Sequence, residues 1–140
     1  MTLSSLWNTQ QLELESITTL ESPLQQRQSL AAIGQRYTDI VWAAGLFEGE
    51  GYIYTNADNY RCIGIEMTDK DVMQRYAAVV GYGQLRPRKT VPANRKQSWR
   101  WDIGKRSEVL RILKDFLPHF GKRRSAKAIE AINHLNEIIN

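Results

Sequence analysis

The chain has 140 residues, of which 42% are apolar, with a formal net charge of +4 and a single cysteine. This length and composition predict one main domain with a hydrophobic core of its own. No apolar run approaches the roughly 18 residues of a membrane span, and the polar N-terminus lacks the pattern of a secretory signal. Cys62 cannot form an internal disulfide, and no Cys/His cluster predicts a zinc site. We therefore expect no membrane association and an intracellular location, either cytoplasmic (bacterial or phage) or organellar.

The first 37 residues are rich in Ser, Thr, Gln and Leu and are expected to be an N-terminal extension, partly helical or disordered. Ser22-Pro23 is a break that could start a helix, and the residues from Leu24 to Tyr37 suggest a short helix that ends near Gly34. Residues 38–140 are expected to form the main domain.

Periodicity predicts the elements of this main domain. Thr38 or Asp39 is expected to cap a helix from Ile40 to Phe47, and strands follow at 51–56 and 60–68. Thr68-Asp69 can cap a helix over 70–80. A second strand pair is predicted at 84–90 and 97–103, followed by a helix that Ser107 caps and that runs through Phe116. A last helix is predicted over 123–139, and its apolar stripe consists of Ala126, Ile129, Ile132, Leu135 and Ile139. The expected fold is α+β, in the order α-β-β-α-β-β-α with an extra C-terminal helix and an antiparallel sheet covered by helices on one face.

Positive charge is concentrated in one part of the chain. Between Arg86 and Arg106 there are eight lysines and arginines and one acid, Asp102. Such a patch is typical of a surface that binds a polyanion. A solvated β-hairpin that only keeps the protein in solution is the plain alternative. The two tryptophans of this region, Trp99 and Trp101, share one strand face and are expected in the core.

The stretch Trp42-Ala43-Ala44-Gly45-Leu46-Phe47-Glu48-Gly49-Glu50-Gly51-Tyr52-Ile53 is unusual for a helix followed by a strand. It contains two interior glycines, each of which costs a helix about 1 kcal/mol relative to alanine. Gly45 and Gly49 are four residues apart and share a face, where another helix could approach closely. Two acids, Glu48 and Glu50, follow at the end of this face. The arrangement suggests a functional site.

Ala43 to Gly51 resembles the LAGLIDADG motif of homing endonucleases and their relatives. Alanine replaces the opening leucine and glutamate replaces both aspartates. The glycine at the third position, the acid-small-acid-glycine ending and the following strand agree with the motif. The order of elements from about Thr38 to Asn140 also agrees with the fold that the motif implies.

The resemblance implies a site for a hard divalent cation. The second acid of the motif, Glu50, would be the metal ligand, the residue before it, Gly49, would contribute its backbone carbonyl, and the ion would be Mg²⁺ or Mn²⁺. Glu48 would have a structural or hydrogen-bonding role near the helix end. By their place in the order of elements, Lys105 is the candidate basic catalytic residue and Asp69 a second catalytic candidate, although a helix cap is the preferred interpretation of Asp69. No D/E-x-K triplet occurs and the two histidines are isolated, which argues against other common nuclease sites.

A single copy of the motif implies a homodimer, because the chain supplies only half of a two-helix seam. The predicted interface residues are Ala44, Gly45, Glu48 and Gly49. The implied function is site-specific cleavage of double-stranded DNA at a long, nearly palindromic target by metal-dependent hydrolysis. The candidate DNA-binding residues are strand and loop side chains: Tyr52, Tyr54, Arg61, Arg86, Arg88, Lys89, Arg95, Lys96, Arg100 and Arg106.

Two other functions remain open at this stage. The same fold could belong to a DNA-binding regulator that has lost cleavage, or to an RNA-splicing maturase, for which RNA would be a partner. An unrelated α+β binding module with a chance motif is a third interpretation.

Overall fold

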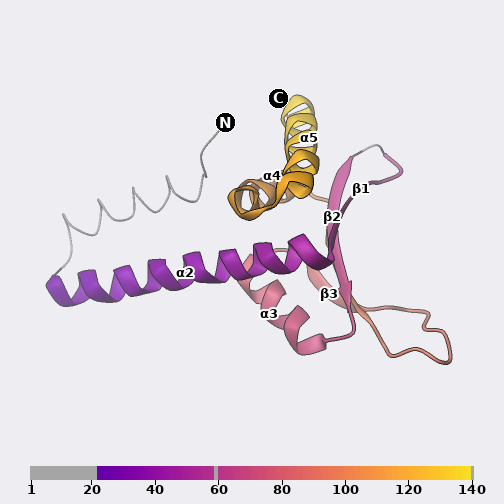
Figure 1. The fold of residues 1–140 in the computed structure, drawn as a ribbon, viewed down its shortest axis with the longest axis horizontal. Coiled ribbons are helices and arrows are strands. Elements are labelled where there is room, and N and C mark those ends of the chain that lie inside the picture. Colours follow the sequence, from indigo (N-terminus) through magenta and orange to yellow (C-terminus); the bar gives the residue numbers. More distant parts are fainter. Residues whose placement is uncertain (1–21, 59, 140) are drawn as a thin grey trace.

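The computed structural model describes residues 22–58 and 60–139. Its elements are α2 (Pro23–Glu50), β1 (Gly51–Thr55), β2 (Arg61–Met67), α3 (Lys70–Val80), β3 (Gln84–Pro87), β4 (Trp99–Ile103), α4 (Arg106–Phe116), the short 3-10 helix η1 (Leu117–His119) and α5 (Lys122–Ile139), as Figure 1 shows. The predicted α+β class and order of elements are confirmed. Within the described part of the chain, no helix has the length and apolar character needed to cross a membrane.

The motif helix α2 is longer than predicted. It is one unbroken helix of 28 residues, about 42 Å long at 1.5 Å per residue. A capping box starts it: the Ser22 hydroxyl accepts from the backbone N–H of Gln25, and the Gln25 side chain accepts from the N–H of Ser22. Pro23 occupies the first turn, where its missing N–H costs nothing.

The predicted helix boundary between Gly34 and Asp39 is wrong. Gly34 lies inside α2, and the Thr38 hydroxyl donates to the Gly34 carbonyl (3.0 Å) instead of capping a new helix. The expected division of the chain between residues 37 and 38 therefore falls within α2. The part of the predicted extension before residue 22 lies outside the described residues.

The four strands form one antiparallel sheet in the order β1-β2-β4-β3. All the helices lie on one side of it (Figure 1). Ile63, Ile65 and Trp101 point to that side and are fully buried. The Trp101 indole N–H donates to the Tyr82 carbonyl (2.8 Å), and the ring of Tyr76 meets the indole edge-on at 4.8 Å. The predicted core position of Trp101 is confirmed.

Several element ends differ from the predictions. β3 and β4 are shorter than expected, since they end at Pro87 and begin at Trp99. The N-cap position of α4 is Lys105 rather than the predicted Ser107, and the Lys105 side chain makes no capping hydrogen bond. On α5 the buried residues are Ala128, Ala131, Ile132 and Leu135, whereas Ile129 is 46% exposed. Ile132 and Leu135 of the predicted stripe are thus confirmed as buried, whereas Ala126 and Ile129 are exposed. The buried and the predicted residues both have helical spacing, so packing against the sheet and α4 decides which face is buried.

Candidate nucleic-acid interface and metal site

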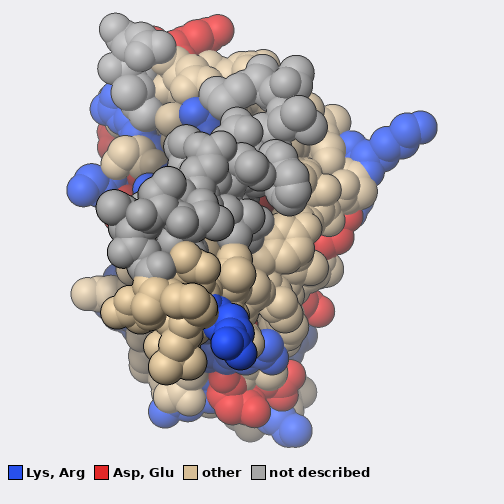
Figure 2. All heavy atoms as spheres, turned by 90° about the vertical axis from the view of Figure 1, so that its left-hand side faces the viewer, with Lys and Arg blue, Asp and Glu red and all other residues tan. Residues whose placement is uncertain are grey.

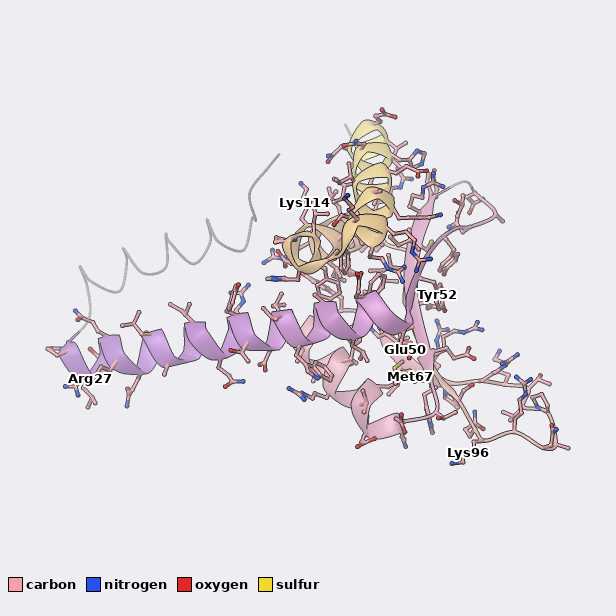
Figure 3. The ribbon with its side chains drawn as sticks, viewed as in Figure 1. Arg27, Glu50, Tyr52, Met67, Lys96 and Lys114 are labelled. Carbon is pink, nitrogen blue, oxygen red and sulfur yellow. The ribbon has the colours of Figure 1, made fainter. Side chains whose placement is uncertain are left out.

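The two acids of the motif point to different places at the end of α2. The Glu48 carboxylate turns back into its own protomer, where it accepts a hydrogen bond from the backbone N–H of Gly121 (2.8 Å). Arg124 lies beside it: its guanidinium donates to the Glu48 carbonyl (3.1 Å) and its Nε is 3.8 Å from the Glu48 carboxylate. The positive charge of Arg124 also interacts favourably with the negative end of the α2 helix dipole. Glu50, by contrast, is exposed at the last residue of α2, next to the start of β1 (Figure 3).

One face of α2 near the motif is open. No other part of the described protomer lies within 4 Å of the place where a Cβ on Gly45 or Gly49 would stand. Val41, one turn before Gly45 on the same face, is 38% exposed. Ala44 points the other way and is completely buried in the core. The predicted interface role of Ala44 is therefore wrong, because its side chain is already covered within the protomer.

The end of α2 offers oxygen donors of the kind that Mg²⁺ prefers. Glu50 supplies an exposed carboxylate, and Gly49 is among the last four residues of the helix, whose carbonyls have no partner within the helix. These two groups fit a hard divalent cation, which usually takes one or two carboxylates together with waters and substrate phosphates. Within the described residues, no cluster of three or more His, Cys, Asp or Glu side chains could hold a metal by itself. One protomer therefore supplies only part of a coordination shell.

The strand register separates Lys105 from Glu50. Gly51, directly after Glu50, is level with Ile65 and Trp101 across the sheet. Lys105 comes four residues after Trp101, roughly 13 Å farther along the strand direction and two strands away. The prediction that Lys105 completes a site with Glu50 is wrong for groups of the same protomer, since the two residues lie at opposite ends of the sheet.

Asp69 lies at the same end of the sheet as Glu50. It follows Met67, which Figure 3 shows near Glu50, and it occupies the cap position of α3. Its side chain makes no capping hydrogen bond, although its carbonyl accepts from the N–H of Met73. The predicted cap position of Asp69 is therefore confirmed, while its exposed carboxylate makes no capping hydrogen bond.

A basic segment that the sequence interpretation passed over lies beside the end of α2. Lys122 and Arg123 are exposed at the start of α5, directly after Gly121, which binds Glu48. In the sequence, the only sign of this segment is the run of three consecutive cations that ends at Arg124. Their proximity to the motif depends on a contact between segments 73 residues apart, which no local pattern predicts.

The uncovered face of the sheet carries polar and aromatic side chains from alternate strand positions. Tyr52 and Tyr54 of β1 lie side by side, with ring centroids 5.6 Å apart. Tyr52 lies across β2, and only the missing side chain of Gly64 permits this, because a Cβ there would stand 2.7 Å from the ring. Burial raises the pKa of both phenols, that of Tyr54 to about 12. Both hydroxyls are therefore neutral at physiological pH and can donate and accept hydrogen bonds.

Arginines and carboxylates alternate beyond the tyrosines on this open face. Glu66 contacts Arg100 (3.1 Å) and Arg88 (3.3 Å), and Asp102 contacts Arg86 (3.0 Å). Together with the two tyrosines, Glu66, Arg100 and Asp102 line a shallow hollow of about 440 Å³. The predicted DNA-binding arginines at positions 86, 88 and 100 are thus brought together on one surface.

The loop between β3 and β4 extends the open face toward the Glu50 end of the sheet. Arg95 and Lys96 line a second hollow of about 350 Å³ together with Arg88 and Glu66. Figure 3 labels Lys96 on this loop, and both Lys96 and Lys89 are exposed. These cations form a basic margin next to the tyrosines and arginines of the sheet.

Known structures resemble this arrangement, whereas no family model and no curated protein matches the sequence. The homing endonuclease I-CvuI, in complex with a target in the presence of magnesium, superposes with a TM-score of 0.60 at 15% identity, covering 76% of this chain and 71% of that one. The archaeal intron-encoded homing endonuclease I-Vdi141I, complexed with DNA, gives 0.56 at 15% identity over 74% and 70%. The LAGLIDADG meganuclease I-CpaMI, bound to uncleaved DNA, gives 0.52 at 16% identity, covering 73% of this chain and 37% of that one. The chain has the LAGLIDADG homing-endonuclease fold.

In this LAGLIDADG fold, two predicted DNA-binding residues lie away from the open face. Arg61 points to the helix-covered face, where it contacts Thr55 and forms an ion pair with Glu130 of α5 (2.8 Å). Arg106 stacks over the ring of Tyr60 at 4.0 Å and donates to the Ile138 carbonyl (3.5 Å). Both arginines join α5 to the hairpin end of the sheet, so their expected place among the DNA readers is wrong.

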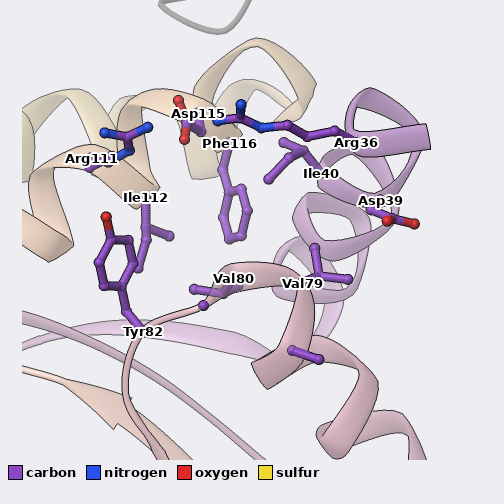
Figure 4. Close-up of a pocket in the computed structure, with 12 residues that line it drawn as sticks. Arg36, Asp39, Ile40, Val79, Val80, Tyr82, Arg111, Ile112, Asp115 and Phe116 are labelled. Atoms are coloured by element: carbon purple, nitrogen blue, oxygen red, sulfur yellow. The ribbon is translucent and has the colours of Figure 1, made fainter. Parts of the chain in front are cut away.

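A third hollow, of about 440 Å³, lies among the helices of the LAGLIDADG fold (Figure 4). Arg36 and Asp115 lie close together at its rim, above an apolar floor that includes Ile112 and Phe116. It contains neither Glu50 nor any open-face residue. The end of the molecule where α2 begins, seen in Figure 2, carries scattered charges of both signs. Neither the hollow among the helices nor the visible surface at the start of α2 indicates a polyanion site.

Proposed function

We propose that this chain is a site-specific double-strand DNA endonuclease that acts as a homodimer and uses Glu50 as a ligand of a divalent metal. The observation that carries the proposal is the position of Glu50: an exposed carboxylate at the end of α2, on the same helix as the open face of Gly45 and Gly49. The matching solved structures include homing endonucleases in complex with DNA.

The glycines support the homodimer. Gly45 and Gly49 destabilise an isolated helix by about 1 kcal/mol each relative to alanine, and no contact within the described protomer accounts for them. A second copy of α2 packed on this face would explain both, because glycine allows two helix backbones to approach closely. The interface would be isologous, with each glycine near its counterpart in the other protomer.

Two such helices would bring two copies of Glu50 and of the Gly49 carbonyl to the two-fold axis. This would supply the oxygen donors that one protomer lacks for metal binding. When bound, a divalent ion supplies a nucleophile at neutral pH and stabilises charge on the phosphate. The role of Glu50 and Gly49 would be to hold it beside the open face of the sheet.

The basic residues of the reaction would come from α5 rather than from Lys105. Lys122 and Arg123 are exposed next to the end of α2, where they could bind the scissile phosphate. Asp69, with a carboxylate that caps no helix, would position water at the same end of the sheet. The sheet and its β3–β4 loop would lie against the DNA, with Lys89, Arg95 and Lys96 on phosphates.

Digestion of a randomised duplex-DNA library in Mg²⁺ or Mn²⁺ tests this proposal. Wild type is expected to cut recurrent, nearly palindromic sites, and Glu50→Gln to cut none of them. Glu137→Gln is the matched control, since it removes an exposed carboxylate from the far end of α5. If neither wild type nor control cuts, yet both select the same duplex, a binding protein of this fold replaces the nuclease. RNA binding in preference to duplex DNA would favour a maturase.

A further inference from the structure

Two carboxylates stand in the middle of the open face, on the surface proposed to meet DNA. Glu66 of β2 and Asp102 of β4 each have side chains that are 24% exposed. Gly64 pairs with Tyr52 on one side and with Asp102 on the other, so Tyr52 and Asp102 lie on the same face of the sheet. Glu66, two residues after Gly64 on β2, lies on that face too. A surface that bound only phosphates would have a higher affinity for them with cations at these two positions, and acids there lower that affinity.

Each carboxylate holds arginine side chains in place. Glu66 accepts from Nε of Arg100 (3.1 Å) through one oxygen and from Arg88 (3.3 Å) and the Ser98 hydroxyl (3.3 Å) through the other. Asp102 accepts from Arg86 (3.0 Å). The side chains of these three arginines remain 45% to 63% exposed. Exposed ion pairs of this kind contribute little to stability, so stability alone does not explain two of them side by side.

Fixing an arginine in this way prepares it for planar recognition. A guanidinium has five N–H donors, so the one or two taken by a carboxylate leave others free to bind a partner. The rotamer entropy that an arginine loses on binding has then been lost before DNA arrives. The adjacent carboxylate repels phosphate, which leaves base edges as the partners for these donors.

We propose that the two arginine–carboxylate groups of the open face read G·C base pairs in the major groove. Arginine donates to the O6 and N7 acceptors of guanine, while glutamate or aspartate accepts from the N4 amino group of cytosine. The Glu66 group, with Arg88 and Arg100, and the Asp102 group, with Arg86, each present a donor set and an acceptor side by side. The inference rests on the proposed function, because it needs duplex DNA against this face.

The register gives the separation of the two carboxylates along the strand direction. Glu66, Arg100 and Arg86 are level across the sheet, and Asp102 is two residues farther along β4. Two residues of strand span about 7 Å, the length of two base-pair steps. Each half-site should therefore contain two G·C positions that depend on separate carboxylates.

Selection of duplexes from a randomised pool, in Ca²⁺ and without cleavage, tests the inference. Wild type should select G·C pairs at two positions of each half-site. Glu66→Gln should lose the preference at one position and Asp102→Asn at the other, each by on the order of 10- to 100-fold in relative affinity. Arg100→Lys keeps the charge but not the planar fork, so it should lose the same preference as Glu66→Gln while still binding duplex DNA.

Matched controls lie on the opposite face of the same sheet. Arg61→Lys and Glu130→Gln alter an arginine–glutamate pair of similar length that faces α5, and both should select the wild-type sequences. Unchanged selection by Glu66→Gln, Asp102→Asn and Arg100→Lys would overturn the inference and leave the proposed function intact. Binding of duplexes by wild type without any G·C preference would likewise overturn the inference and leave the proposed function intact. Failure of wild type to bind any duplex would overturn both.

Discussion

Glu48 accepts a hydrogen bond from the backbone N–H of Gly121 at 2.8 Å, across a separation of 73 residues. This contact, with Arg124 beside it, ties the end of the motif helix to the start of α5. It also separates the two acids of the motif, because Glu48 is committed to its own protomer whereas Glu50 is exposed.

The first prediction concerns Glu48→Ala. The substitution removes the acceptor for Gly121 and the ion pair with Arg124, so we expect a loss of about 1–2 kcal/mol in the free energy of unfolding. Denaturant unfolding of wild type and variant measures it. Glu137→Ala, on the exposed end of α5, is the control and should be within about 0.5 kcal/mol of wild type. A neutral Glu48→Ala would contradict the anchoring role.

The second prediction concerns the open face of α2. Gly45→Leu should leave the protomer folded, because no other part of it lies within 4 Å of the new Cβ and leucine favours a helix over glycine. It should, however, prevent close packing of two helices and convert the proposed dimer to a monomer. Light scattering gives the mass, and circular dichroism gives the helix content.

Gln74→Leu, an exposed substitution on α3, is the control for added apolar surface and should remain dimeric. A Gly45→Leu protein that is still a dimer at the same concentration would place the interface elsewhere.

The third prediction compares two glycines with positive φ. Gly81 (φ 78°) ends α3 and has open space around it, whereas a Cβ on Gly83 (φ 79°) would stand 2.7 Å from the Trp101 indole. Gly81→Ala should cost about 1 kcal/mol from backbone strain alone. Gly83→Ala should lower the free energy of unfolding by at least about 2 kcal/mol, because overpacking of the core adds to the backbone strain. Thermal unfolding of the pair checks the order, and equal costs would argue against this packing of Trp101.

The sequence was sufficient for the order of elements and for the main contents of the open face. The alternation along the strand places Trp99 and Trp101 on one face, as predicted, and by the same rule Arg100 and Asp102 lie on the other. The same alternation groups Arg61 with Ile63 and Ile65, so its place on the helix-covered face followed from a rule already in use. The predicted DNA-binding role of Arg61 therefore conflicts with the strand periodicity itself.

Other features needed the three-dimensional structure. Thr38 and Asp39 are good cap residues, yet the helix continues through them because Thr38 bonds back to Gly34. Lys105 follows the fourth strand in sequence, but only the strand register shows at which end of the sheet it lies. The proximity of Lys122 and Arg123 to the motif depends on the Glu48–Gly121 contact, which joins distant segments.

The fourth prediction concerns His119 in the turn before α5. Burial lowers the pKa of its imidazole, and no group among residues 22–58 and 60–139 hydrogen-bonds its buried Nε2. The unfolded chain therefore binds the proton more readily than the folded one. Its contribution to stability is present above the ordinary pKa of about 6.5 and is lost as the pH falls below that value. His119→Gln should reduce the difference in unfolding free energy between pH 7.5 and pH 5.5. An unchanged difference would contradict the buried, neutral imidazole.

The most direct measurement is strand-resolved cleavage of one selected duplex, labelled on both strands, by wild type and Glu50→Gln in Mg²⁺. We expect wild type to cut both strands at positions related by a two-fold axis. Glu50→Gln should bind the same duplex with similar affinity and cut at least about 100-fold more slowly. Cleavage by Glu50→Gln at the wild-type rate would contradict the assignment of Glu50, and cutting of one strand only by wild type would contradict the symmetric dimer.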